Sequence, residues 1–79
     1  MNTELIKDIK VEITVEIGRK KITIKELLSI NQGSIVELDN KTDAPLKFFV
    51  NGKLFGTCEI VQMPNDKLGM RVLQIFGKK

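Results

Sequence analysis

The chain contains no histidine, tryptophan or tyrosine, and Cys58 is the only cysteine among its 79 residues. A lone cysteine excludes a disulfide within the chain, and one thiol without histidine provides too few ligands for a structural zinc site. A domain of this length buries only about 60% of the surface that its unfolded chain exposes, so it needs further stabilisation. With disulfides and zinc excluded, oligomerisation is the expected source of that stabilisation.

Groups that could perform catalysis are equally scarce. Cys58 stands within a predicted strand, between Thr57 and Glu59, and no imidazole is available to activate it. The glycines occur singly at predicted turns and match no phosphate-binding loop. We therefore expect Cys58 to be a buried structural residue, and we expect no cofactor and no enzymatic activity.

Membrane insertion and nucleic-acid binding are also disfavoured. No apolar run approaches the ~20 residues that cross a bilayer, so we expect no direct membrane insertion. The single cysteine, without a secretory signal, favours the cytoplasm. The net charge of +3 comes from scattered basic residues, and only four phenylalanines could stack on bases. A small swapped-dimer nucleic-acid-binding protein is therefore a remote alternative, because its basic cluster is interleaved with acids. That cluster comprises Lys7, Lys10, Arg19, Lys20 and Lys21.

The apolar residues are mostly isoleucine, leucine and valine, and the many β-branched residues among them favour strands. Strict alternation over residues 9–17 predicts a long strand, followed by a tight turn at residues 18–19. Further strands are predicted over residues 34–38, 46–50, 54–63 and 70–75. Asn51-Gly52 predicts a type I′ hairpin turn between two of them, and Gly56 predicts a bulge or a close backbone approach.

One short helix is predicted over residues 24–30. Thr23 and Glu26 have the spacing of a capping box, and Ile24, Leu27 and Leu28 follow at the spacing of one helix face. A helix of one or two turns is too short to stand alone, so we expect it to pack on the sheet. The predicted fold is therefore mostly β, with one short helix per chain.

Two of the predicted strands carry apolar residues on both faces, as at Phe48-Phe49 and Ile60-Val61. A chain of this length has few remaining residues that could cover both faces of these strands, so we predict a homodimer. A small closed monomeric barrel is the alternative. We assign the predicted dimer core to the alternating residues Ile13, Val15, Ile17, Phe48 and Val50.

Several motifs together resemble one family. They are V-x-x-T-V-E-x-G-R at residues 11–19, T-I-K-E-L-L at 23–28, Q-G-S-I-V-x-L-D at 32–39 and G-M-R-V at 69–72. In this order and spacing they resemble the C-terminal domain of flagellar motor switch protein FliN. This SpoA (surface presentation of antigens) domain is shared with FliM, FliY and type III secretion C-ring proteins. The resemblance extends over residues 9–75.

The resemblance implies an intertwined, strand-swapped homodimer, with a SpoA-like domain at residues 9–76 after a flexible N-terminal lead-in at residues 1–8. It implies a structural component of the cytoplasmic C-ring, peripheral at the inner-membrane flagellar basal body. The implied partners are FliM-like switch proteins, a FliH-like regulator of the export ATPase and the phosphorylated chemotaxis response regulator. The alternative is the corresponding C-ring protein of a virulence type III secretion injectisome.

The resemblance also implies a partner-binding surface. In FliN-like proteins an apolar run follows a Glu of the returning strand, and Glu59 matches that Glu. The run here is Ile60, Val61, Gln62 and Met63, with a polar Gln62 where the family usually has valine. We expect Val61 and Met63 to contact a partner, whereas Ile60, on the other face, favours the dimer core.

Overall fold

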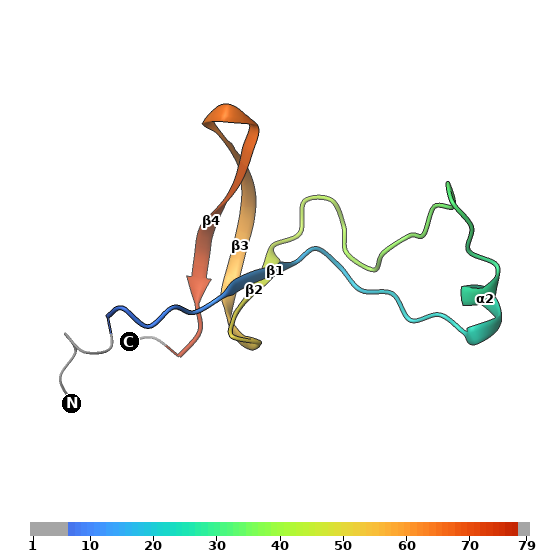
Figure 1. The fold of residues 1–79 in the computed structure, drawn as a ribbon, viewed down its shortest axis with the longest axis horizontal. Helices are drawn as coiled ribbons and strands as arrows, with labels where there is room; N and C mark the ends of the chain where they lie inside the picture. Colours follow the sequence, from blue (N-terminus) through green and yellow to red (C-terminus); the bar gives the residue numbers. More distant parts are fainter. Residues whose placement is uncertain (1–6, 78–79) are drawn as a thin grey trace.

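The structure is a computed structural model that describes residues 7–77, and it consists of one antiparallel sheet and a projecting arm (Figure 1). The four strands lie in the order β1-β2-β3-β4, and a short helix, α2, lies at the far end of the arm. The predicted mostly β fold with one short helix is confirmed. Of the predicted lead-in, residues 1–6 lie outside the described residues, and Lys7 and Asp8 form a turn. The elements are β1 (Ile13–Glu16), α2 (Ile24–Leu28), β2 (Leu46–Val50), β3 (Lys53–Met63), the 3-10 turn η1 (Pro64–Asp66) and β4 (Lys67–Ile75).

The hairpin between β2 and β3 turns at Asn51-Gly52, as predicted. The φ angles are 48° at Asn51 and 81° at Gly52. A type I′ turn requires positive φ at both central residues, and asparagine followed by glycine adopts that conformation most readily. The turn sets the register in which Val50 pairs with Lys53 and Leu46 with Cys58.

The strand β3 is irregular around Gly56, again as predicted. The β2–β3 register shifts between Phe48 and Phe49, and the β3–β4 register shifts between Thr57 and Cys58. A Cβ atom at Gly56 would collide with the carbonyl oxygen of Gln74 and the ring of Phe48. Glycine is therefore required here because the neighbouring strand and a core side chain approach the backbone closely.

The strand β4 begins at Lys67, three residues before the predicted start at Met70. The reason is the tight turn of η1, in which Asn65 and Asp66 have φ angles of 65° and 61°. Asparagine and aspartate tolerate this left-handed conformation better than other non-glycine residues. The pairing of β3 with β4 consequently starts immediately, with Met63 opposite Lys67.

The helix α2 has the predicted capping box. The Thr23 hydroxyl accepts a hydrogen bond from the Glu26 backbone N–H at 3.1 Å, and the Thr23 N–H donates to Glu26 Oε1 at 3.2 Å. The helix ends at Leu28, two residues earlier than predicted, with Ser29 as its C-cap. The predicted packing of this helix on the sheet is wrong, because α2 lies at the end of the arm, where Ile24 and Leu28 are 77% and 79% exposed.

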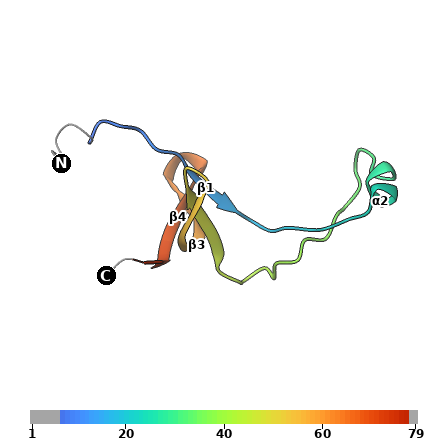
Figure 2. The ribbon, with the colours of Figure 1, turned by 90° about the horizontal axis from the view of Figure 1, so that it is seen from below.

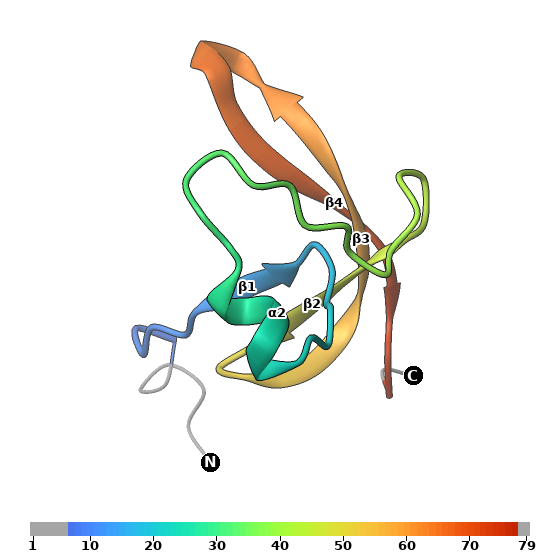
Figure 3. The ribbon, with the colours of Figure 1, turned by 90° about the vertical axis from the view of Figure 1, so that its right-hand side faces the viewer.

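Residues 17–45 form the arm, which leaves the sheet after β1 and returns at β2 (Figures 1 and 2). Figure 3 views the molecule from the end of the arm. The two sides of the arm are joined by the Asp39 N–H, which donates to the Arg19 carbonyl at 2.8 Å. The predicted turn at residues 18–19 and the predicted strand at residues 34–38 are wrong for this chain. Among the described residues neither segment belongs to a strand, although Gly18 and Leu38 lie beside each other where the two sides of the arm meet.

The first strand is also shorter than predicted, four residues instead of nine. Its pairing partners run only from Lys47 to Val50, opposite Glu16 to Ile13. Residues 9–12 continue the alternation without a strand assignment, because β2 has ended opposite them.

The chain is far more open than a compact domain of the same size. Its radius of gyration is 17.1 Å, against about 12 Å for a compact chain of this length. Its accessible surface is 7579 Å², against about 4,800 Å² for a compact monomer of its mass. Among the described residues, the buried apolar side chains are Phe48 and Cys58, while twenty large apolar side chains are exposed. The single chain therefore leaves exposed a large apolar surface of the kind that a compact domain buries.

Candidate interaction surface

One face of the sheet gathers the predicted dimer core. In the β1–β2 register, Ile13 pairs with Val50 and Val15 with Phe48, so these four side chains share one face. Phe48 is 3% exposed, Val15 and Val50 are half-buried, and Ile13 is 54% exposed. We call this side of the sheet the apolar face. The fifth predicted residue, Ile17, lies beyond the end of β1 and is 65% exposed, so the chain does not bring it into this cluster.

The apolar face extends across β3 and β4 through residues that were not among the predicted dimer-core residues. Cys58 lies between Leu46 on β2 and Val72 on β4 and has no exposed surface. The ring of Phe55 packs against the ring of Phe48, with the two centroids 5.7 Å apart. The alternation of Leu46 with Phe48 was a usable signal for Leu46, whereas the bulge that brings Phe55 to Phe48 has no clear sequence signature.

The predicted partner-binding residues divide between the two faces of β3. Ile60 follows Cys58 by two residues, lies on the apolar face opposite Met70 and is 42% exposed. Val61 and Met63 lie on the opposite face. Val61 is half-buried and Met63 is 47% exposed, with its side chain over Gly69. The structure thus agrees with the predicted separation of Ile60 from Val61 and Met63.

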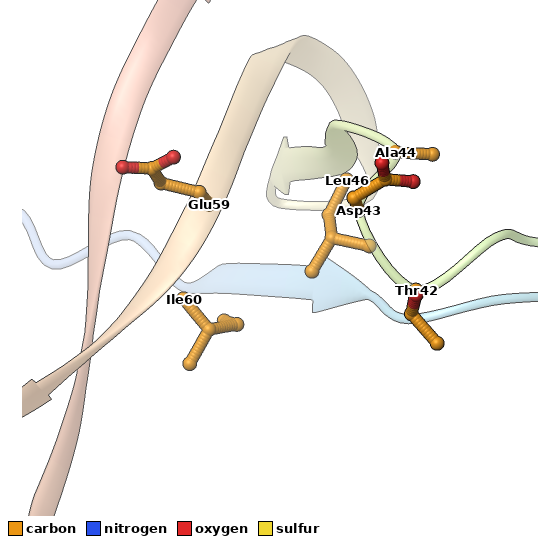
Figure 4. Close-up of a pocket in the computed structure, with 6 residues that line it drawn as sticks. All are labelled: Thr42, Asp43, Ala44, Leu46, Glu59 and Ile60. Atoms are coloured by element: carbon orange, nitrogen blue, oxygen red, sulfur yellow. The ribbon is translucent and has the colours of Figure 1, made fainter.

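Beside this run lies a hollow of about 350 Å³ between β3 and the end of the arm. In Figure 4, the apolar side chains of Leu46 and Ile60 lie on one side of it with Asp43, whereas the Glu59 carboxylate is directed towards β4, where it contacts Arg71. The lining residues are Thr42, Asp43, Ala44, Leu46, Glu59 and Ile60.

Some of the exposed charged side chains of the sheet and the arm form ion pairs. Arg71 on β4 contacts Glu59 on β3 at 2.8 Å, and Arg19 contacts Glu16 at 2.8 Å. Lys20 lies 4.0 Å from Asp39 across the arm. Such exposed pairs contribute about 0–1 kcal/mol each.

The described residues contain no arrangement suited to catalysis or metal binding. Burial raises the pKa of the Cys58 thiol, which keeps it protonated and unreactive at neutral pH. Within residues 7–77, no three histidine, cysteine or acidic side chains are grouped as metal ligands. What the surface can do chemically is to bury apolar area and pair charges.

No helix in the described part of the chain combines the length and apolarity needed to span a membrane. The one α-helix, α2, has five residues.

Comparison with known proteins agrees with the motif resemblance. A family model described as the type III flagellar switch regulator (C-ring) FliN C-terminal domain matches residues 4–77. The chain is 49% identical over 73 residues to flagellar motor switch protein FliN of Pectobacterium carotovorum subsp. carotovorum, covering 92% of the chain and 68% of that protein. It is 47% identical over 73 residues to FliN of Escherichia coli (strain K12), covering 92% of the chain but only 53% of that protein.

Among solved structures, YscQ-C from Yersinia pseudotuberculosis has the same fold. The match has a TM-score of 0.74 with 24% sequence identity and covers 94% of this chain and 86% of that chain. At this identity the likeness concerns the fold alone. A match to flagellar motor switch phosphatase FliY of Bacillus subtilis (strain 168), at 36% identity, covers 98% of this chain but only 20% of FliY. A domain that spans so small a part of FliY gives no reason to assign its phosphatase activity here.

Proposed function

Because the chain belongs to the family of FliN C-terminal domains, the type III flagellar switch regulators of the C-ring, we propose that it is a structural and interaction component of the flagellar motor switch. In this role it would stand in the cytoplasmic C-ring, at the base of the flagellum, and bind neighbouring switch proteins of the FliM type. The flagellar relatives at 47% and 49% identity support this role. The role requires contact surfaces and no catalytic group.

The observation that carries the proposal is the uncovered surface of the chain. The excess over a compact monomer is roughly 2,800 Å² per chain, or about 5,600 Å² for two copies, which lies at the upper end of what permanent homodimers bury in total. We propose that a second copy covers the apolar face and receives the arm, giving an intertwined dimer with Ile13, Val15, Phe48 and Val50 in its core. Ile17, at the root of the arm, would join that core only when the second copy is present.

We further propose that Val61 and Met63 form the site for an external partner, with Ile60 and Gln62 at its margin. Because Val61 and Met63 lie on the opposite face of β3, a second copy on the apolar face leaves them accessible. The proposed partner is a FliH-like regulator of the export ATPase, bound by an amphipathic helix or an extended segment. The phosphorylated chemotaxis response regulator is a further proposed partner of the assembled ring.

Replacing Val61 by aspartate tests this site. The charge has no partner at the centre of an apolar contact, so we expect capture of the FliH-type regulator of the same bacterium to fall by about tenfold or more. The measurement is a pull-down or titration calorimetry, with the dimer mass checked by light scattering.

The matched control is Gln74→Asp. Gln74 pairs with Thr57 and therefore lies on the same face as Val61 but farther along the sheet. This variant should retain both dimer and capture. Capture by Val61→Asp at the level of the unaltered chain would remove the partner site from this face, without touching the dimer proposal.

A C-ring protein of a type III secretion injectisome is the second candidate, and the fold match to YscQ-C favours it. The flagellar role has stronger support, because identity to the flagellar relatives is about twice the identity to YscQ-C. The genes that flank this one distinguish the two systems directly.

A further inference from the structure

Asn51 lies in the turn between β2 and β3, and it also forms hydrogen bonds to the residue that precedes β1. Its backbone N–H donates to the Glu12 carbonyl at 2.9 Å, and its side-chain Oδ1 accepts from the Glu12 N–H at 2.9 Å. These two bonds lie one residue beyond the last pair of the β1–β2 ladder, Ile13 with Val50. The Asn51 side chain therefore acts as an additional strand residue that holds the start of β1 on the sheet.

The same residue is chemically labile, because Asn51-Gly52 is the only Asn-Gly pair in the chain. Without a side chain on Gly52, its backbone nitrogen can attack the Asn51 side-chain carbonyl carbon, Cγ, with little hindrance. A new N–C bond closes a five-membered succinimide ring, the proton of that nitrogen is lost to solvent and the amide nitrogen leaves as ammonia. Water then opens the ring at either carbonyl, giving aspartate or isoaspartate.

The folded turn opposes this attack. Asn51 and Gly52 hold the type I′ conformation, and the Asn51 carboxamide is directed to the Glu12 N–H by its hydrogen bond. The Gly52 nitrogen can reach Cγ only after Asn51 leaves both Glu12 and the turn. We propose that Asn51 is a deamidation site controlled by the docking of β1, and that the isoaspartate product releases β1 from the sheet.

The two products have different consequences for β1. Aspartate keeps an oxygen in the position of Oδ1, so it can still accept from the Glu12 N–H. Isoaspartate lengthens the main chain by one methylene and shortens the side chain, so the turn and the contact to Glu12 are both lost. Only the second product leaves the edge of β1 without its additional hydrogen bonds.

The test is to incubate the full chain at mildly alkaline pH, folded and in urea, and to follow each asparagine by peptide mass mapping. We expect Asn51 to react first in urea and at least about tenfold more slowly in the folded chain, because local opening must precede attack. Chromatography then separates the aspartate and isoaspartate forms, and hydrogen exchange of residues 12–16 reports β1. We expect faster exchange in the isoaspartate form and unchanged exchange in the aspartate form.

Two encoded variants make the result decisive. Asn51→Asp imitates the aspartate product and should keep the exchange of the unaltered chain. Asn51→Gly retains the positive φ but removes Oδ1, so residues 12–16 should exchange faster without any incubation. Equal deamidation rates in the folded chain and in urea, or an isoaspartate form in which β1 exchanges as in the unaltered chain, would overturn the proposal.

Discussion

At the scale of single residues, Ile13 distinguishes the isolated chain from the assembled molecule. Ile13 is more than half exposed in the single chain, where a substitution to aspartate would change the free energy of unfolding by only about 0.5 kcal/mol. In the proposed dimer core the same charge is buried without a partner, and we expect a loss of about 3 kcal/mol or more, with failure to fold at low concentration. Urea denaturation followed by circular dichroism measures the difference.

Thr14→Asp is the matched control for this experiment. Thr14 is the next residue of β1, pairs with Phe49 and lies on the opposite face of the sheet. It should unfold like the unaltered chain. An Ile13→Asp chain as stable as the Thr14→Asp chain would mean that no second copy covers the apolar face.

Residue patterns predicted the apolar face well, and particular residues show why. The alternation of Phe48 with Val50, and of Ile13 with Val15, identifies one face because the period of a strand is two. Cys58 was recognised as a structural residue, and its complete burial agrees. Phe55 and Val72 were missed, since bulges on either side of Gly56 change which side chains share a face.

At the scale of elements, the local sequence around α2 was sufficient to predict where this helix begins. The Thr23 and Glu26 pair predicted the helix start, and both hydrogen bonds of the capping box are present. The hydrogen bond from the Thr23 N–H, followed by that from its hydroxyl, lowers the pKa of Glu26, and the charge of Lys20 contributes last.

This ordering gives a prediction for α2. Because folding lowers the pKa of Glu26, its contribution is present above the unfolded-state pKa and is lost as the pH falls through the lower, folded-state pKa. Thr23→Ala removes the hydroxyl donor but keeps the backbone N–H, so in an NMR titration it should raise the pKa of Glu26 part of the way towards that of a free glutamate, and more than Lys20→Ala does. A Glu26 that titrates as a free glutamate in the unaltered chain would contradict the capping account.

The predicted strand at residues 34–38 and the long strand at residues 9–17 show where local signals fail. The alternation over residues 9–17 is real, but a strand also needs a ladder of backbone hydrogen bonds to a neighbouring strand, and the described part of the chain has no such ladder at residues 9–12, 17 or 34–38. The sequence can show that a segment is suited to pair with another strand in a sheet. It cannot show whether the partner strand belongs to the same chain.

At the scale of the whole molecule, a sheet and an arm share almost no interior. Ile35 in the arm is 96% exposed. The helix α2 lies far from the sheet in Figure 1. Apolar area left in water forfeits about 25 cal/mol per Å², so this shape is unfavourable for an isolated chain. A second copy that received the arm would bury both the arm and the apolar face.

Sedimentation equilibrium of the purified chain at micromolar concentration tests this claim most directly. Two copies sharing one interior predict a folded species of twice the 8.9 kDa chain mass, with unfolding and dissociation in a single step. A cooperatively folded species that stays at 8.9 kDa at every concentration would contradict it.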